Sequence, residues 1–281
     1  MDLLHLLHLE PQEGRALRED EYIRQSDGMI CCKSCHTPRE RFLQILDKTY
    51  RPRMMCRCQS EAYDKEQEED RHRRFLEQIS RNRSVGLPDP EHRKHTFAND
   101  LGYNPIQMKA AKNYVENWKD LSREGTGLLL WGGVGTGKSF LAGCIANGLL
   151  DKGVRVLMTN FSRLLNNLSD LRFSERNSFI NSLSDYPLLI IDDLGIERNS
   201  DYAKEQVFSV IDSRYRSGKP MIITTNLSLR EMSGSRDVTK SRIYNRILER
   251  CTPLEVSNLN IRNRNAISNH QKVTEILRRG A

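Results

Sequence analysis

The amino-acid sequence predicts an α/β fold, in which a mostly parallel five-stranded sheet is flanked by helices and preceded by a small N-terminal domain and a helical linker. Three observations support this prediction. A glycine-rich loop separates an apolar run from an apolar helix, later apolar runs alternate with amphipathic segments, and five of the seven cysteines lie within residues 31–58. Alternating strands and helices are typical of a parallel sheet.

The chain length and a segment containing proline and glycine predict two domains. The chain has 281 residues, 37% of them apolar, which suffices for a real core. Residues 84–90 contain two prolines and a glycine, so we place the boundary there, with domains at 1–84 and 85–281. No apolar run approaches the length of about 18 residues that a spanning helix needs. Residues 1–10 are leucine-rich but lack the basic start of a signal peptide, so we expect a cytoplasmic protein without a membrane partner.

The clustered cysteines form two short pairs separated by twenty residues. In a cytosolic chain such clusters more often bind metal than form disulfides. Four thiolates can close tetrahedrally on Zn²⁺ and so stabilise a domain whose own core is small. The predicted ligands are Cys32, Cys35, Cys56 and Cys58. Cys31 or His36 could replace one of them, and free thiols or an iron–sulfur cluster are the alternatives.

Two helices are predicted ahead of the glycine-rich loop. Residues 61–83 are dense in charges of both signs, with a few apolar residues at helical spacing, which indicates an exposed helix leading into a linker. Apolar residues then recur at spacings of three and four over residues 108–121, which indicates one amphipathic helix just before the loop.

The glycine-rich loop, residues 132–139, fits the P-loop pattern that binds phosphate. It follows the apolar strand 127–131 and precedes an apolar helix, which is the context that such a loop requires. Glycines let backbone N–H groups approach the phosphates, Lys138 adds a charge for the β- and γ-phosphates, and the Ser139 hydroxyl is a ligand for Mg²⁺. The predicted nucleotide-binding residues are Gly132, Gly133, Val134, Gly135, Thr136, Gly137, Lys138, Ser139 and Phe140.

Polar side chains follow two later strands at the point where each strand ends. The further predicted strands are residues 154–158, 187–193 and 221–226, with a helix at 202–216. Because the carboxyl ends of parallel strands face the ligand, we assign Asp192 to Mg²⁺ through water and Asp193 to polarising the attacking water. Asn226 could hydrogen-bond that water, although it is also a common turn residue.

The net charge of +7 is concentrated near the C-terminus. Residues 230–281 contain eleven Lys and Arg against five Asp and Glu, a net charge of +6. A basic region beside a nucleotide site suggests a polyanionic partner such as nucleic acid. A basic face that serves only solubility is the alternative.

With these motifs placed, residues 95–265 resemble the AAA+ ATPases of the DnaC/DnaI helicase-loader and IstB-like group. The resemblance is carried by the P-loop, the strand Leu188–Asp193, the run Ile222-Ile-Thr-Thr-Asn-Leu227 and the run Ser241-Arg-Ile-Tyr-Asn-Arg246. The cysteine module joined by a charged helix resembles, more loosely, that of phage-type loaders.

The resemblance implies ATP bound between neighbouring subunits, so that an arginine of one protomer reaches the γ-phosphate of the next. By motif position that arginine is Arg242, with Arg246 as the competing candidate, and Arg262 falls where the family places its sensor-two arginine. Asp193 departs from the common AAA+ pattern, in which Glu is more frequent, so we expect slow turnover stimulated by DNA or a partner.

In loaders of this kind the N-terminal domain grips the hexameric replicative helicase and the ATPase domain contacts single-stranded DNA. The resemblance therefore implies a DNA-replication ATPase of bacterial or phage origin, acting in the bacterial or infected-host cytoplasm. The alternatives are an IstB-like transposition helper, an ATP-gated binding adaptor with little turnover, and a small-molecule kinase.

Overall fold

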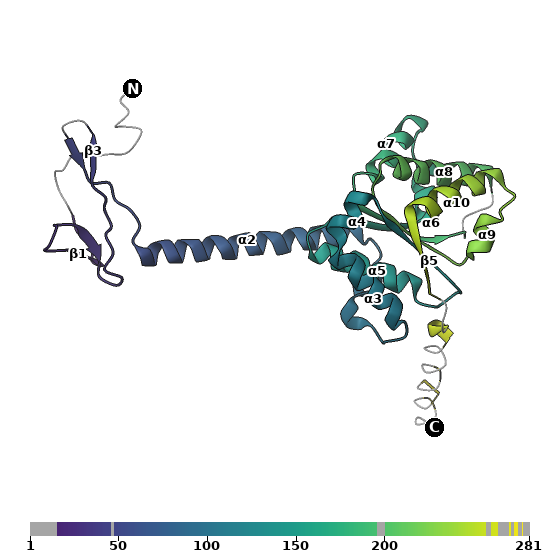
Figure 1. Cartoon of the computed structure of the whole chain (residues 1–281), viewed down its shortest axis with the longest axis horizontal. Coiled ribbons are helices and arrows are strands. Elements are labelled where there is room, and N and C mark those ends of the chain that lie inside the picture. Colours follow the sequence, from purple (N-terminus) through teal and green to yellow (C-terminus); the bar gives the residue numbers. More distant parts are fainter. Residues whose placement is uncertain are drawn as a thin grey trace. The chain divides into compact units, whose positions relative to one another are not determined.

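The computed structural model describes residues 16–45, 48–195, 200–256, 260–263, 270, 273–274 and 277 (Figure 1). The leucine-rich opening at residues 1–10 and much of the basic stretch after residue 256 lie outside the described residues. Packing divides the chain into two units, Met1–Leu76 and Glu77–Ala281. The domain boundary after residue 84 stays a prediction.

The N-terminal unit contains two small antiparallel hairpins. The strands β1 (Glu21–Ile23) and β2 (Ile30–Cys32) pair with each other, as do β3 (Leu43–Ile45) and β4 (Lys48–Tyr50). Charged groups are part of its interior, because the buried Glu21 carboxylate accepts hydrogen bonds from Arg39 and Arg53. Buried charges of this kind require close partners. Strands of three residues leave little apolar core, so this unit needs stabilising interactions other than apolar burial, such as these ion pairs.

The charged helix expected at residues 61–83 is present as α2 (Arg57–Gly86). Most of its residues are exposed, and pairs such as Lys65–Glu69 run along its surface. Its last residue is buried against the larger unit's sheet: a Cβ on Gly86 would lie 2.0 Å from the carbonyl oxygen of Val156. Only glycine can approach the backbone of a strand this closely.

The larger unit is built on a five-stranded sheet in the order β6-β7-β8-β5-β9. Every pair of neighbouring strands is parallel, so the predicted α/β fold with a mostly parallel five-stranded sheet is confirmed. The strands are β5 (Gly127–Trp131), β6 (Val156–Asn160), β7 (Leu188–Leu194), β8 (Met221–Thr225) and β9 (Cys251–Glu255). The buried central strands are almost continuously apolar, as expected for a sheet covered on both faces.

Helices cover both faces of this sheet, and each face has its own apolar cluster (Figure 1). The first cluster packs α3 (Pro105–Glu116), α4 (Trp118–Glu124) and α5 (Lys138–Asp151) on the sheet. The second packs α6 (Phe161–Asp170), α7 (Phe173–Leu183), α8 (Asp201–Arg216), α9 (Leu229–Ser233) and α10 (Val238–Arg250). Two short 3₁₀ turns, η1 (His92–Lys94) and η2 (Phe97–Asn99), precede α3.

Two elements differ from the prediction. The single helix expected over residues 108–121 is divided into α3 and α4, because Asn117 leaves helical geometry with a ψ of 19°. The fifth strand is β9, in a segment for which no strand was predicted. It lies at the edge of the sheet and contains Pro253, which an edge strand tolerates because its outer side needs no N–H donor. No helix within the described ranges is both long and apolar enough to cross a bilayer.

Candidate functional site

The P-loop connects the end of β5 to the start of α5. Its first glycine, Gly132, has a φ of 145° and lies against the chain after β9, where a Cβ would be 2.3 Å from the Val256 carbonyl oxygen. Its last, Gly137, has a φ of 102° and is the N-cap of α5. Both conformations strongly favour glycine. The loop therefore presents backbone N–H groups and the positive end of a helix dipole to an anion.

Lys138 is buried and fully hydrogen-bonded. Its Nζ donates to the carbonyl oxygens of Gly132 at 3.0 Å and Gly133 at 2.6 Å, and to Asn226 Oδ1 at 2.8 Å. These three acceptors use all three protons of the ammonium group. Burial lowers the pKa of Lys138, and the nearby carboxylates of Asp193 and Asp192 act in the opposite direction. The side chain thus lies at the floor of the loop, ready to exchange carbonyl partners for phosphate oxygens.

The two residues predicted to hold Mg²⁺, Ser139 and Asp192, are hydrogen-bonded to each other. Ser139 Oγ donates to Asp192 Oδ1 at 2.9 Å, and Thr224 Oγ1 donates to the same oxygen at 2.6 Å. Asp192 is 7% exposed, at the carboxyl end of β7. A hydroxyl beside a carboxylate is a donor set that suits Mg²⁺, which prefers oxygen ligands and retains water.

Asp193 lies at an irregularity in the pairing of β7 with β8. The register of β7 against β8 shifts between Ile191 and Leu194, and Asp193 has a φ of 59°, a left-handed conformation rare outside glycine. Its N–H donates to Thr224 Oγ1 at 2.9 Å, which holds this backbone in place. Burial, followed by the charge of Asp192, raises the pKa of Asp193. Strain and a raised pKa at the same carboxylate are typical of a functional position.

The predicted phosphate-site residues meet in one pocket of about 510 Å³. Its lining includes Val134, Gly135, Thr136, Gly137, Lys138, Ser139, Phe140, Asp193, Asn226 and Arg262. Gly132 and Gly133 do not line it and instead hold Lys138. Pockets of this size suit a nucleotide, and the location at the carboxyl ends of parallel strands is the one expected for such a ligand.

Arg262 lies at this pocket because its segment is hydrogen-bonded to the P-loop. The N–H of Ile261 donates to the Gly135 carbonyl oxygen at 2.9 Å, and the Asn260 side chain caps the following turn through the N–H of Asn263. Burial is the main cause of the lowered pKa of Lys138, and the positive charge of Arg262 adds to it, whereas at Asp193 the same charge partly offsets the raised pKa. Its position is therefore consistent with an arginine that senses phosphate.

The other wall of the pocket was not anticipated from the sequence. It is formed by Ile261 and by residues that lie before α3 or in its first turn. These residues are Glu91, His95, Asn99, Asp100, Leu101, Tyr103, Asn104 and Met108. Asn104 is 8% exposed, and its Nδ2 donates to the Thr136 carbonyl oxygen at 2.9 Å, which ties this wall to the P-loop. The only local signal was Asn104 directly before Pro105, a pattern that marks the start of a helix but not a ligand.

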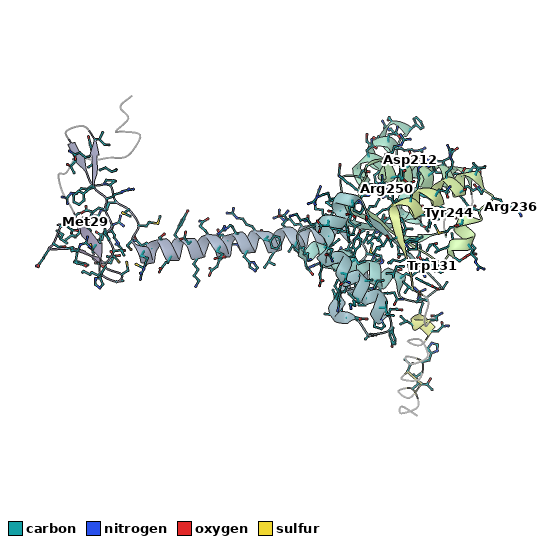
Figure 2. The ribbon with its side chains drawn as sticks, viewed as in Figure 1. Met29, Trp131, Asp212, Arg236, Tyr244 and Arg250 are labelled. Atoms are coloured by element: carbon teal, nitrogen blue, oxygen red, sulfur yellow. The ribbon has the colours of Figure 1, made fainter. Side chains whose placement is uncertain are left out.

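The two candidate finger arginines have different environments on α10. Arg246 is partly buried, forms an ion pair with Asp212 at 2.6 Å and lies over the Phe208 ring. Arg242 is exposed and does not line the pocket of its own chain. Asp212 and Tyr244 mark this pair of helices, α8 and α10, in Figure 2. An arginine that acts on a neighbouring subunit must not be held in an ion pair within its own chain. The described contact of Arg242 is with the Phe208 ring, so Arg242 fits that requirement better than Arg246.

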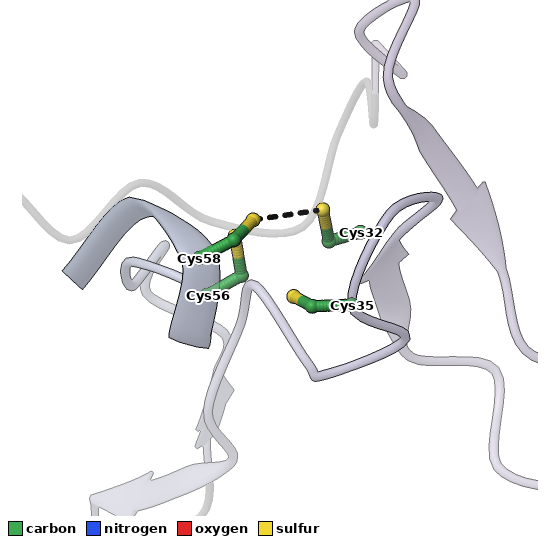
Figure 3. A group of neighbouring side chains, drawn as sticks. All are labelled: Cys32, Cys35, Cys56 and Cys58. Atoms are coloured by element: carbon green, nitrogen blue, oxygen red, sulfur yellow. Dashed lines mark hydrogen bonds between the residues drawn. The ribbon is translucent and has the colours of Figure 1, made fainter. Parts of the chain in front are cut away.

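The four predicted zinc ligands converge in the N-terminal unit (Figure 3). The Sγ atoms of Cys32, Cys35, Cys56 and Cys58 all lie within 4.8 Å of one another. Two of the distances are 3.6 Å for Cys32–Cys58 and 3.3 Å for Cys56–Cys58. Tetrahedral Zn²⁺ with bonds of about 2.3 Å separates its sulfurs by about 3.8 Å, so the group fits this ion. Neither Cys31 nor His36 belongs to the group.

The electrostatics of the cysteine cluster also favour a bound cation. A hydrogen bond from the Thr37 hydroxyl lowers the pKa of Cys35 to about 5. Hydrogen bonding of the Cys58 thiol with Cys56, Cys35 and Cys32, followed by burial, raises the pKa of Cys58 to about 12. Arg39 Nη2 lies 3.5 Å from Cys32 Sγ. Four thiolates are stable together when a divalent cation neutralises them.

Comparisons with known proteins agree with this site. The family model described as IstB-like ATP binding protein matches residues 60–269. The replicative helicase loader DnaC of Escherichia coli K12 is 30% identical over 165 residues, which cover 56% of this chain and 66% of the DnaC chain, just under two thirds of its length. A crystal structure of DnaI has a TM-score of 0.51 and 25% identity, covering 62% of this chain and 93% of DnaI.

A crystal structure of a DNA replication initiation factor, 21% identical with a TM-score of 0.50, shares the fold and covers 64% of this chain and 54% of its own. The matched family region contains the P-loop, both aspartates, Asn226, Arg242 and Arg262 and omits the cysteine cluster. The chain therefore belongs to the IstB-like ATP-binding family, within the AAA+ group that includes the helicase loader DnaC.

Proposed function

We propose that this chain binds and hydrolyses ATP with Mg²⁺ in order to load a replicative helicase onto single-stranded DNA. The observation that carries the nucleotide part is the convergence of Lys138, Ser139 and Asp193 at one pocket, with Asp192 hydrogen-bonded to Ser139 just outside its lining. The loader part is supported by the relationship to DnaC, a protein named as a replicative helicase loader. We place the activity in the cytoplasm of a bacterium or a phage-infected host.

In this proposal, each site residue has one task. Ser139, and Asp192 through water, would hold Mg²⁺, which would supply charge neutralisation to the phosphates. Lys138 leaves the two P-loop carbonyl oxygens and pairs with the same phosphates. Asp193 accepts a proton from the attacking water, and Asn226, once released from Lys138, orients that water. The shorter side chain of Asp193 relative to Glu suits slow turnover that a partner or DNA stimulates.

The position of Arg242 supports the proposal that a neighbouring subunit completes the site. The residue is exposed on α10 and lies outside its own pocket, so self-association is the way in which its guanidinium reaches a γ-phosphate. Arg246 is the weaker candidate, because its ion pair with Asp212 would have to break first. Loss of the γ-phosphate on hydrolysis would then shift the equilibrium from one state of the assembly to another.

The N-terminal unit is proposed to hold structural Zn²⁺ and to contact the helicase. The four Sγ atoms supply a closed coordination set, which leaves no open position for catalysis. Zinc would supply folding energy to a unit whose hairpins have little core. The basic residues 230–281 are proposed to contribute backbone-directed, salt-sensitive binding of single-stranded DNA.

Capture of the helicase by the purified full-length chain tests the loader proposal. The chain, immobilised with ATP and Mg²⁺, is incubated with the replicative helicase of a candidate host, and the Cys56→Ser and Lys138→Ala variants are run beside it. We expect the intact chain to retain the helicase, the cysteine variant to lose it, and the lysine variant to lose nucleotide dependence. Failure of the intact chain to retain any replicative helicase would refute the loader role and leave an ATPase of another purpose.

A second candidate function is an IstB-like transposition helper, since the matched family carries that name. The cysteine cluster lies outside the matched residues, which favours a partner other than that of IstB. Retention of a transposase in place of the helicase would favour the second candidate. Measurement of ATP turnover with and without single-stranded DNA separates both from an ATP-gated adaptor, for which turnover would stay near zero.

A further inference from the structure

Phe208 on α8 lies close to two arginines of α10. The guanidinium carbon of Arg242 is 5.5 Å from the centre of the Phe208 ring, and that of Arg246 is 4.5 Å from it. Both distances are within the range of about 6 Å over which a cation is attracted to the negative face of an aromatic ring. One ring therefore contacts both candidate finger arginines.

The two arginines differ in their other contacts, because Arg246 shares the Asp212 carboxylate with Arg216. The Asp212 carboxylate, one turn after Phe208 on α8, pairs with Arg246 Nη2 at 2.6 Å. Arg246 also lies 5.7 Å from the centre of the Tyr215 ring. These contacts hold the Arg246 side chain against α8 of its own chain. The Asp212 carboxylate also reduces the repulsion between the positive charges of Arg246 and Arg242. Arg242 is left exposed, with the Phe208 ring as its described side-chain contact on α8.

We infer that Phe208 is the positioning residue for the finger Arg242, a role that rests on the proposed trans action of Arg242. An exposed arginine samples many rotamers, and most of them direct its guanidinium away from a neighbouring active site. Attraction to the ring selects the rotamers in which the side chain lies along the α8–α10 surface. Arg246, which is paired with Asp212, contacts the same ring. Phe208 itself touches no nucleotide and acts through Arg242.

Mixed assemblies provide the test, because they separate the chain that gives the finger from the chain that hydrolyses. The Asp193→Asn chain is the donor: it keeps Arg242 and is expected to hydrolyse little ATP itself. The Arg242→Ala chain is the acceptor: it keeps its own pocket but gives no finger. An equimolar mixture is expected to recover hydrolysis that neither chain shows alone. The measured quantity is kcat at saturating ATP, with KM determined in parallel.

Phe208 is then changed only in the donor. With Asp193→Asn/Phe208→Leu, which keeps apolar volume but removes the ring, recovered kcat is expected to fall by about five-fold while KM is unchanged, since the lost contact is of cation–π size. Phe208→Tyr, which keeps the ring, is expected to restore it. Asp212→Asn in the donor leaves the ring but frees the Arg246 charge, and is expected to lower recovery as well. Unfolding temperatures of all donors are measured to exclude a folding defect.

The outcomes distinguish the inference from the proposal beneath it. If the donor carrying Asp193→Asn restores hydrolysis and the additional Phe208→Leu change has no effect, Phe208 does not position the finger and the trans role of Arg242 stands. If the donor fails to restore hydrolysis at all, the trans role of Arg242 is wrong and the inference is overturned with it. Equal loss with Leu and with Tyr would also overturn it, because the ring would then not be the cause.

Discussion

Ser139 Oγ donates a hydrogen bond to Asp192 Oδ1 over 2.9 Å, which joins the first turn of α5 to the carboxyl end of β7. Two residues separated by more than fifty positions in the chain thus meet at the point where Mg²⁺ is expected. Both oxygens that would hold Mg²⁺, Ser139 directly and Asp192 through water, are thus already side by side, so little reorganisation would be needed.

Removal of the Ser139 hydroxyl should therefore weaken the binding of Mg²⁺ more than the binding of the nucleotide itself. For Ser139→Ala we expect ATP affinity in the presence of Mg²⁺ to fall by about 10- to 100-fold, with little change when EDTA is present. Titration with a fluorescent ATP analogue under both conditions measures this. Thr224→Val is the matched control, because it removes the other hydrogen bond to Asp192 without removing a ligand. An equal loss with and without Mg²⁺ would contradict the assignment.

Asp193 is predicted to be needed for hydrolysis and not for binding. Asn tolerates the left-handed backbone found at this position, so Asp193→Asn should fold normally, bind ATP as before and lower kcat by about 100-fold or more. Single-turnover hydrolysis and nucleotide titration on the same preparation measure both quantities. Turnover close to that of the unaltered chain would assign proton transfer to another group.

The raised pKa of Asp193 also predicts a pH dependence. The carboxylate accepts a proton only in its ionised form, so kcat should decline as the pH falls through this pKa. Because burial and Asp192 raise the pKa, the decline should begin at a higher pH than for an aspartate of ordinary pKa. A pH profile of kcat between about 4 and 8, the range in which carboxylates with raised pKa titrate, tests this.

One zinc ion per chain is expected in the N-terminal unit. Cys58→Ser should abolish zinc binding and unfold the hairpins, and ATP binding by the larger unit should persist. Metal analysis by mass spectrometry and amide NMR spectra measure the two effects. Cys31→Ser and Cys144→Ala serve as controls because both thiols lie outside the four-cysteine group. Loss of zinc in Cys31→Ser would show that the ligand set had been assigned wrongly.

Arg242 and Arg246 should respond differently to alanine. Arg242→Ala is expected to leave unfolding unchanged and to remove the dependence of hydrolysis on protein concentration, since its guanidinium is exposed. Arg246→Ala breaks the partly buried pair with Asp212 and should lower the free energy of unfolding by about 1–3 kcal/mol. Chemical unfolding and concentration-dependent turnover measure the difference. A stable but inactive Arg246→Ala would exchange the two roles.

The parts of the site that the sequence predicted are those with local signals. Lys138 and Ser139 belong to one contiguous loop, and Asp192 follows a strand whose apolar run is unmistakable. Both signals depend on a few neighbouring residues and on the general rule that ligands bind at the carboxyl ends of parallel strands. Four of the five strands of the parallel sheet were predicted from the same alternation.

What the sequence could not reveal depends on contacts between distant segments. Asn104 reaches the P-loop only because α3 packs beside α5, and no spacing rule connects it to Thr136. The choice between Arg242 and Arg246 depends on Asp212 and Phe208, which are on another helix. β9 is recognised as a strand only through its pairing with β5, since its own residues include a proline.

The close approach of Gly86 to Val156 has a consequence for the solubility of the larger unit. β6 and β9 are the two outer strands of the sheet, and an outer strand offers unpaired backbone groups to which a foreign chain can add. The end of α2 occupies part of the β6 margin, and Pro253 removes a donor from β9. A side chain at position 86 would lift the helix from this margin, and the chain would gain a surface for aggregation while its nucleotide pocket stayed intact.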